Sequence, residues 1–191
     1  MNKRLISKLM RERVSGVHVS GGYFFRGDFE YVLQGVLFEY VPRGVYIWGF
    51  RFPLFDFFGE NLLYSSRLSN KPFIGKGEMS EHEIVDHALS APEVKSLFSS
   101  GRSMSLSEFL SFLESGDIAN PHAHLIRAAA LVLLGKDNSA SQLLDELGPR
   151  LHPADVAHYL ELKNALEKGH AFAESLLEQI RQENIKKLVA A

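Results

Sequence analysis

The chain has 191 residues, of which 46% are hydrophobic and 23% charged, as in a folded protein long enough to bury a core. A formal net charge of −2 gives it no overall attraction for nucleic acid. The absence of cysteine excludes disulfides, thiolate metal ligands and a cysteine nucleophile. With neither a secretory signal nor an apolar run of membrane-spanning length, we expect a cytoplasmic protein without membrane contact.

The first thirteen residues are basic and predict a short helix. Leu5, Ile6, Leu9 and Met10 recur at the spacing of one helical face. This face suits a helix that packs on the following sheet. A surface arm for a membrane or nucleic acid is the other interpretation.

Residues 1–75 form an aromatic-rich half that predicts an antiparallel β-meander. It holds 16 of the 21 aromatic residues and carries 10 Lys/Arg against 6 Asp/Glu. The expected strands are 23–26, 29–41, 45–52 and 62–68. Gly35 predicts a bulge or bend, and the Pro42–Gly44 turn predicts a hairpin. The apolar stretch 54–59 is a loop whose structure the pattern does not predict.

The strand 45–52 alternates strictly. Tyr46, Trp48, Phe50 and Phe52 share one face, and Val45, Ile47, Gly49 and Arg51 share the other. The aromatic face could be the core face of the sheet, a patch for a protein partner, or a platform for stacking bases of single-stranded nucleic acid.

Residues 76–191 carry 11 Lys/Arg against 17 Asp/Glu and predict an all-helical half. Two capping boxes, Ser80–Glu83 and Ser105–Glu108, mark helix starts. Glycines 101, 116, 135, 148 and 169 are placed as C-caps that need positive φ. The expected helices are 80–90, 92–100, 105–115, 121–134, 138–147, 153–168 and 170–189. The predicted fold class is therefore α+β, with a leading helix, an antiparallel meander and a half of helix hairpins.

The segments 139–147 and 172–180 match at an offset of 33, and Gly135 and Gly169 precede them at an offset of 34. This period is typical of helix-hairpin repeats. Residues 121–189 accordingly resemble degenerate tetratricopeptide-like hairpins. Two such units are too few to stand alone, so we expect them to pack on the sheet.

The sequence contains no recognisable catalytic or cofactor motif, so the chain is more plausibly a binder than an enzyme, with neither cofactor nor metal. His82 and His87 are five residues apart, which separates them around a helix. His122 and His124 point in nearly opposite directions within a helix and cannot share one ion. His122 and His124 are interpreted as surface or packing residues.

The charged residues around the strands suit recognition of a partner, because arginine beside acid favours polar interfaces. We expect the arginines on the face opposite the aromatics or at its rim. The candidate partner-binding residues are Arg26, Arg43, Arg51, Asp56, Glu60 and Arg67.

Gly22–Phe25, Tyr46-x-Trp48-x-Phe50, Pro53-Leu54 and Leu63–Arg67 carry a resemblance over residues 22–68. This segment resembles small uncharacterised bacterial proteins found near secreted toxins, which implies an immunity role. The leading hypothesis is a protein-interaction module that binds and occludes a toxin. One alternative is an enzyme or small-ligand binder with a cleft between the halves around Arg26, Arg51, Asp56 and Arg67. The other is single-stranded nucleic-acid binding by the aromatic sheet, which the charge disfavours. The sequence gives no oligomeric state.

Overall fold

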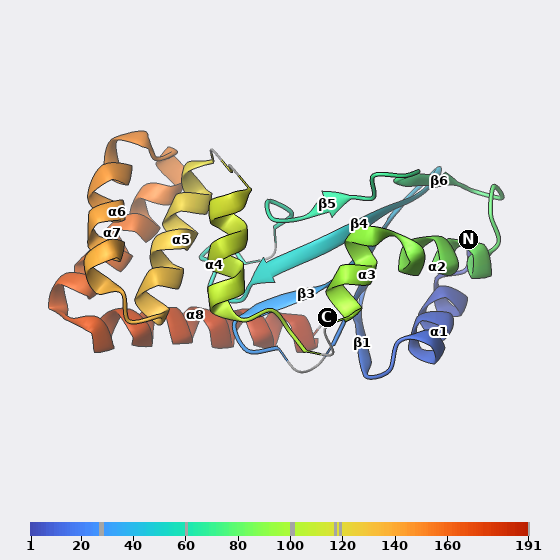
Figure 1. Cartoon of the computed structure of the whole chain (residues 1–191), viewed down its shortest axis with the longest axis horizontal. Helices are drawn as coiled ribbons and strands as arrows, with labels where there is room; N and C mark the ends of the chain where they lie inside the picture. Colours follow the sequence, from blue (N-terminus) through green and yellow to red (C-terminus); the bar gives the residue numbers. More distant parts are fainter. Residues whose placement is uncertain (27–28, 60, 100–101, 117, 119, 191) are drawn as a thin grey trace. The chain divides into compact units, whose positions relative to one another are not determined.

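The structure is a computed structural model that describes residues 1–26, 29–59, 61–99, 102–116, 118 and 120–190 (Figure 1). A helix is followed by an antiparallel meander and then by helices, which confirms the predicted α+β class. Among these residues no helix is both long and apolar enough to cross a membrane. The chain divides into two compact units, each described separately below.

The first unit comprises residues 1–52, 61–104 and 188–191. Its sheet has the strand order β1-β2-β3-β4-β5, and β6 also pairs with β4. The strands are β1 (Val17–Ser20), β2 (Tyr23–Arg26), β3 (Val32–Val41), β4 (Gly44–Pro53), β5 (Ser66–Arg67) and β6 (Phe73–Gly75). The short strands β1 and β6 were not predicted, and β5 is much shorter than expected.

Three helices belong to this unit and cover one face of its sheet (Figure 1). They are α1 (Lys3–Arg13), α2 (Glu81–Ser90) and α3 (Pro92–Ser99). The buried residues Ile6, Leu9 and Met10 of α1 join one hydrophobic core with Val45 and Ile47 of β4. The stripe on α1 therefore packs on the sheet, as the first interpretation expected. The expected boundary near residue 75 differs from the observed one, since α2 and α3 lie with the sheet.

The core face of β4 is the one that carries Val45 and Ile47. Both side chains are fully buried, whereas Tyr46 and Trp48 on the other face are half-buried. A Cβ added at Gly49 would meet Leu97 of α3, so the same helix covers this position. Of the aromatic row, Phe50 and Phe52 are buried. The alternation was predicted correctly, but aromatic size does not identify the side that the helices cover.

The second unit comprises residues 53–60 and 105–187. Its helices are α4 (Leu106–Ser115), α5 (Pro121–Leu133), α6 (Asp137–Leu147), α7 (Pro153–Lys168) and α8 (His170–Ala190), with a 3₁₀ turn at Gly148–Arg150. The predicted capping box Ser105–Glu108 begins α4, and Asn120 caps α5 before Pro121; the other predicted box, Ser80–Glu83, begins α2 of the first unit. Gly135 and Gly169 have positive φ, as expected for turn glycines. The expectation is wrong at Gly116 and Gly148, whose φ values are negative. Gly101 lies outside the described residues.

Gly35 is required by close approach rather than by a bulge. Strand β3 runs without interruption from Val32 to Val41, and Gly35 is paired with Phe25 of β2. A Cβ at Gly35 would collide with the carbonyl oxygen of Phe24 and touch the ring of Phe50. The predicted bend is therefore absent, and the glycine lets two strands and an aromatic ring pack together.

We expect Gly35→Ala to lower the free energy of unfolding by about 2 kcal/mol or more, because an overpacked strand must shift. Urea denaturation of the purified chain measures the change. Gly75→Ala is the matched control, since its Cβ would meet only Glu78 at an ordinary 3.4 Å. Equal stability of the two variants would contradict the packing argument.

Candidate functional site

The loop that follows β4, residues 54–59, inserts into the hydrophobic core of the helical unit. Leu54 and Phe55 are fully buried, and the ring of Phe55 lies edge-on to that of Phe109 in α4, with centroids 6.3 Å apart. Asn184 of α8 is also buried and donates from Nδ2 to the carbonyl oxygens of Leu54 (2.8 Å) and Asp56 (3.0 Å). These bonds satisfy a loop backbone that would otherwise lose its hydration on burial. The apolar stretch is thus an ordered part of this unit.

At the centre of this insertion lies a buried cluster of three titratable side chains. His122 of α5 places Nδ1 2.7 Å from Asp155 Oδ1 of α7. Its Nε2 lies 3.1 Å from both carboxylate oxygens of Asp56 in the loop. All three residues are buried, and Asp56 is fully so. Since each ring nitrogen faces a carboxylate, the geometry suits a doubly protonated imidazolium that donates in both directions.

The electrostatics of the cluster favour the charged histidine. Burial acts to lower the pKa of His122, but hydrogen bonds and charge attraction from Asp56 and Asp155 outweigh it and raise the pKa above its ordinary value. Asp56 also accepts a bond from the backbone N–H of Phe58 at 3.0 Å. The ring of Phe58 lies 4.9 Å from that of His122 and closes over it. The cluster is therefore a satisfied, covered ion network.

A second histidine–aspartate pair repeats the first in reversed order. Nδ1 of His170, the first residue of α8, lies 3.0 Å from Oδ1 of Asp137, the first residue of α6. His122 and Asp155 are 33 residues apart, and so are Asp137 and His170. The first hairpin has histidine and then aspartate (His122, Asp137), and the second has aspartate and then histidine at the equivalent positions (Asp155, His170). Asp137 raises the pKa of His170 as well, although this pair is more exposed.

The chemistry available to the buried cluster is structural. His122 has both nitrogens engaged, and its ring is covered by Phe58. Within the described residues no group of three or more acidic or histidine side chains is arranged to hold a metal ion. A base whose proton cannot reach a substrate does not meet the geometric requirement of acid–base catalysis. The cluster ties the loop, α5 and α7 together.

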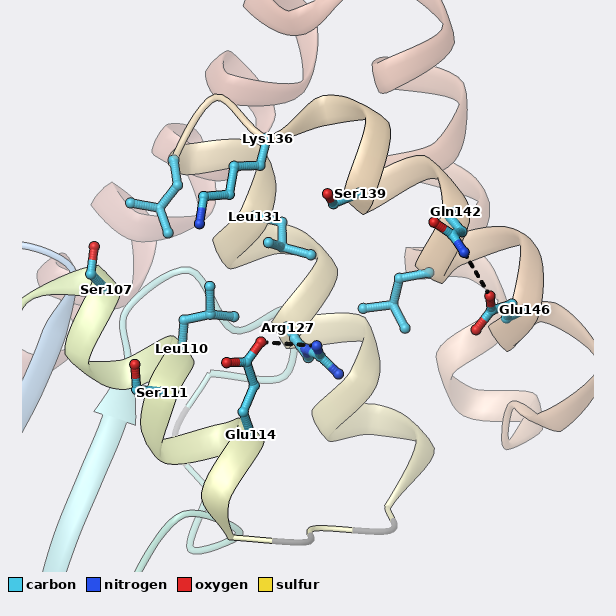
Figure 2. Close-up of a pocket in the computed structure, with 12 residues that line it drawn as sticks. Ser107, Leu110, Ser111, Glu114, Arg127, Leu131, Lys136, Ser139, Gln142 and Glu146 are labelled. Carbon is cyan, nitrogen blue, oxygen red and sulfur yellow. Dashed lines mark hydrogen bonds and ion pairs between the residues drawn. The ribbon is translucent and has the colours of Figure 1, made fainter.

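The helical unit has an open groove on another of its surfaces, with a volume of about 500 Å³ (Figure 2). Helices α4, α5 and α6 each contribute residues spaced three and four apart, so each presents one continuous face. Leucines and polar or charged residues line it together. The leucines are Leu110, Leu131, Leu134 and Leu143, and the polar and charged residues include Ser107, Glu114, Arg127, Lys136, Gln142 and Glu146.

The charges of the groove are only partly paired. Arg127 Nη2 donates to Glu114 at 2.9 Å, and Gln142 Nε2 donates to Glu146 at 3.3 Å. Lys136 is exposed at the turn between α5 and α6, and its side chain extends towards the groove (Figure 2). No carboxylate of the described residues forms an ion pair with Lys136. The arrangement can therefore take an apolar group against the leucines and an anion at Lys136.

The six residues predicted from sequence have different surroundings. Arg26 donates from Nη2 to the carbonyl oxygen of Phe98 in the last turn of α3, at 3.0 Å. Arg51 is half-buried, and burial lowers its pKa. Asp56 is enclosed by its partners, and Glu60 lies outside the described residues.

Arg43 and Arg67 are the two predicted arginines that remain exposed. Arg67 stacks on Tyr46 and Trp48 from β5, the last strand in the sheet order, so it lies at the rim of the aromatic face and not on the opposite face. Arg51 alternates to the face of Val45 and Ile47. Arg51 and Arg67 therefore lie on opposite faces of the sheet.

Sequence reasoning missed the buried cluster and the groove. The histidine–aspartate exchange at an offset of 33 is a signal that a search of the repeat for complementary charges could have found.

Comparisons with protein-family models, with curated proteins and with solved structures find no match to this chain.

Replacing His122 by glutamine should lower the free energy of unfolding by about 3 kcal/mol or more, because two carboxylates lose a buried charged partner. Urea denaturation at pH 6.5 measures this loss. His82→Gln on the exposed side of α2 is the control and should stay within about 0.5 kcal/mol of the parent. A comparably small effect at His122 would show that the cluster is not a stabilising network.

The stability that His122 contributes should also depend on pH. Because its pKa is raised in the folded state, the contribution is complete below the ordinary histidine pKa of about 6.5 and is lost as pH rises through the folded value. The stability difference between the parent and His122→Gln should therefore shrink between pH 6.5 and 9. Making both measurements in a His170→Gln background removes the second pair, whose pKa shift has the same sign. A difference that stays constant, or grows, would contradict the charged-histidine assignment.

Proposed function

We propose that this chain is a protein-interaction module whose α4–α6 groove holds a short segment of a partner protein. The observation that carries the proposal is the groove itself, which is lined by four leucines and by Lys136, a lysine without an ion-pair partner in the described chain. Its volume falls within the range of about 300–1,000 Å³ typical of pockets that bury a ligand. The leucines favour an apolar group of the ligand, and Lys136, whose ammonium has no ion-pair partner in the described chain, favours an acidic one.

The expected occupant is an amphipathic segment with one or two large apolar side chains and a neighbouring acidic residue. The apolar side chains would cover Leu134 and Leu143, the half-buried leucines of the groove, which removes apolar surface from water. The carboxylate would lie at Lys136, whose ammonium has no ion-pair partner in the described chain. The Arg127–Glu114 pair, at the side of the groove, would fix the register of polar groups on the partner.

The resemblance of residues 22–68 to proteins found near secreted toxins extends this proposal to an immunity role. The partner would then be a toxin, and the module would act in the cytoplasm by steric occlusion. A binding role is favoured over catalysis because the buried titratable groups around His122 are covered and satisfied.

The groove proposal predicts that one substitution at Lys136 weakens partner binding. The full chain, tagged and expressed in its source organism, is used to capture a stoichiometric protein partner. The affinity of that partner is then measured for Lys136→Glu and Leu143→Glu. Each variant should bind at least about tenfold more weakly, as expected for an anchor residue in an interface.

Lys168→Glu is the matched control, because Lys168 is exposed at the end of α7 and does not line the groove. It makes the same charge change in the same unit and should leave binding unchanged. Failure to recover a partner, or equal binding by the Lys136 and Lys168 variants, would overturn the groove proposal.

A further inference from the structure

A cation held on two aromatic rings stands out on the sheet of the first unit. The guanidinium carbon of Arg67 lies 4.3 Å from the ring centre of Tyr46 and 4.6 Å from that of Trp48. Arg67 is directly opposite Trp48 in the β4–β5 pairing. Its backbone register therefore places the side chain over these rings, and the cation–π attraction keeps it there.

The rings beneath Arg67 are themselves fixed. Trp48 donates from Nε1 to Glu39 Oε2 at 2.8 Å. The ring of Tyr46 packs on that of Phe73 in β6, with centroids 4.8 Å apart. Since these contacts hold the rings before any partner arrives, ordering Arg67 adds little entropic cost to binding.

The polar side of Arg67 is available to a partner. The residue is exposed, and no hydrogen bond or ion pair joins its guanidinium to another group in the described part of the chain. An arginine with fixed orientation matches a carboxylate through two parallel N–H donors. Tryptophan, tyrosine and arginine are also the residues most enriched among the energetic anchors of protein interfaces.

Further positive charge continues along the same edge of the sheet. Strands β5 and β6 pair with successive parts of β4, so Arg67 is level with Trp48 and Gly75 is level with Gly44. Lys76 and Arg43 follow at the end of this edge, where the Lys76 N–H donates to the Arg43 carbonyl oxygen. Both side chains are exposed without an ion-pair partner among the described residues, whereas Lys71 is paired with Glu78. At about 3.3 Å per residue, the cations cover roughly 17 Å.

We infer that Arg67, seated on Tyr46 and Trp48, anchors a second docking surface that binds an acidic segment of a protein partner. One carboxylate of that segment pairs with Arg67, and a second reaches Lys76 or Arg43. A base-stacking role is disfavoured because the guanidinium already occupies the ring faces that a base would need. This surface lies in the sheet unit and does not depend on the groove of the helical unit.

Trp48 is the only tryptophan of the chain, so its fluorescence reports on this surface directly. The experiment titrates the full chain with octaglutamate at low salt and follows Trp48 emission. Anisotropy of a dye-labelled octaglutamate then gives the affinity for each variant. We expect a saturable change in Trp48 emission, and binding to Arg67→Gln weakened at least about tenfold. Arg67→Lys, which keeps the charge but not the planar fork, should also bind more weakly than the parent.

Lys95→Gln is the matched control, because Lys95 is an exposed cation on α3 of the same unit, and it should bind as the parent does. Circular dichroism of each variant confirms that the fold is retained. No saturable change in Trp48 emission, or equal octaglutamate binding by Arg67→Gln and Lys95→Gln, would overturn the inference. An eight-residue oligo-dT that binds more tightly than octaglutamate, with the same dependence on Arg67, would overturn it in favour of nucleic acid.

Discussion

The helical unit depends on one buried ion network, in which His122 is shared between Asp56 and Asp155. Isolated charges are very costly in a protein interior, so this arrangement is stable only when all three partners are present and hydrogen-bonded. The network joins a loop, α5 and α7, segments far apart in the chain. Its energetic consequence is cooperative: loss of any member leaves an uncompensated charge among apolar side chains.

The network and the groove share one helix, α5. His122 lies in the first turn of α5, and Leu131 in its last turn lines the groove together with the C-cap residue Leu134. Since α5 is buried along most of its length, its packing fixes the positions of these leucines. The groove is consequently preformed, and a ligand that enters it need not order the helix. Preorganisation of this kind lowers the conformational entropy that any ligand of the groove would have to remove on binding.

Local signals predicted the helices well and the sheet less well. Capping boxes and a period of 33–34 are local in sequence, and the observed helices match the expected ranges within about two residues. Strand β6 and the brevity of β5 depend on pairing with distant β4, which no local pattern encodes. The His122–Asp155 pair has a trace in the repeat, but its third member, Asp56, comes from a loop 66 residues away. The convergence of these groups follows from tertiary packing alone.

The arginines show why residue type and strand position do not define a binding surface. Arg26 and Arg67 both belong to strands of one sheet, and both were predicted for the same role. Arg26 donates to a carbonyl at the C-terminal end of α3, where a cation complements the helix dipole. Arg67 instead meets two aromatic rings, which attract its charge but accept none of its N–H groups in conventional hydrogen bonds. Only stacking on aromatic rings, as at Arg67, orients a guanidinium and leaves its N–H donors free to bind another molecule.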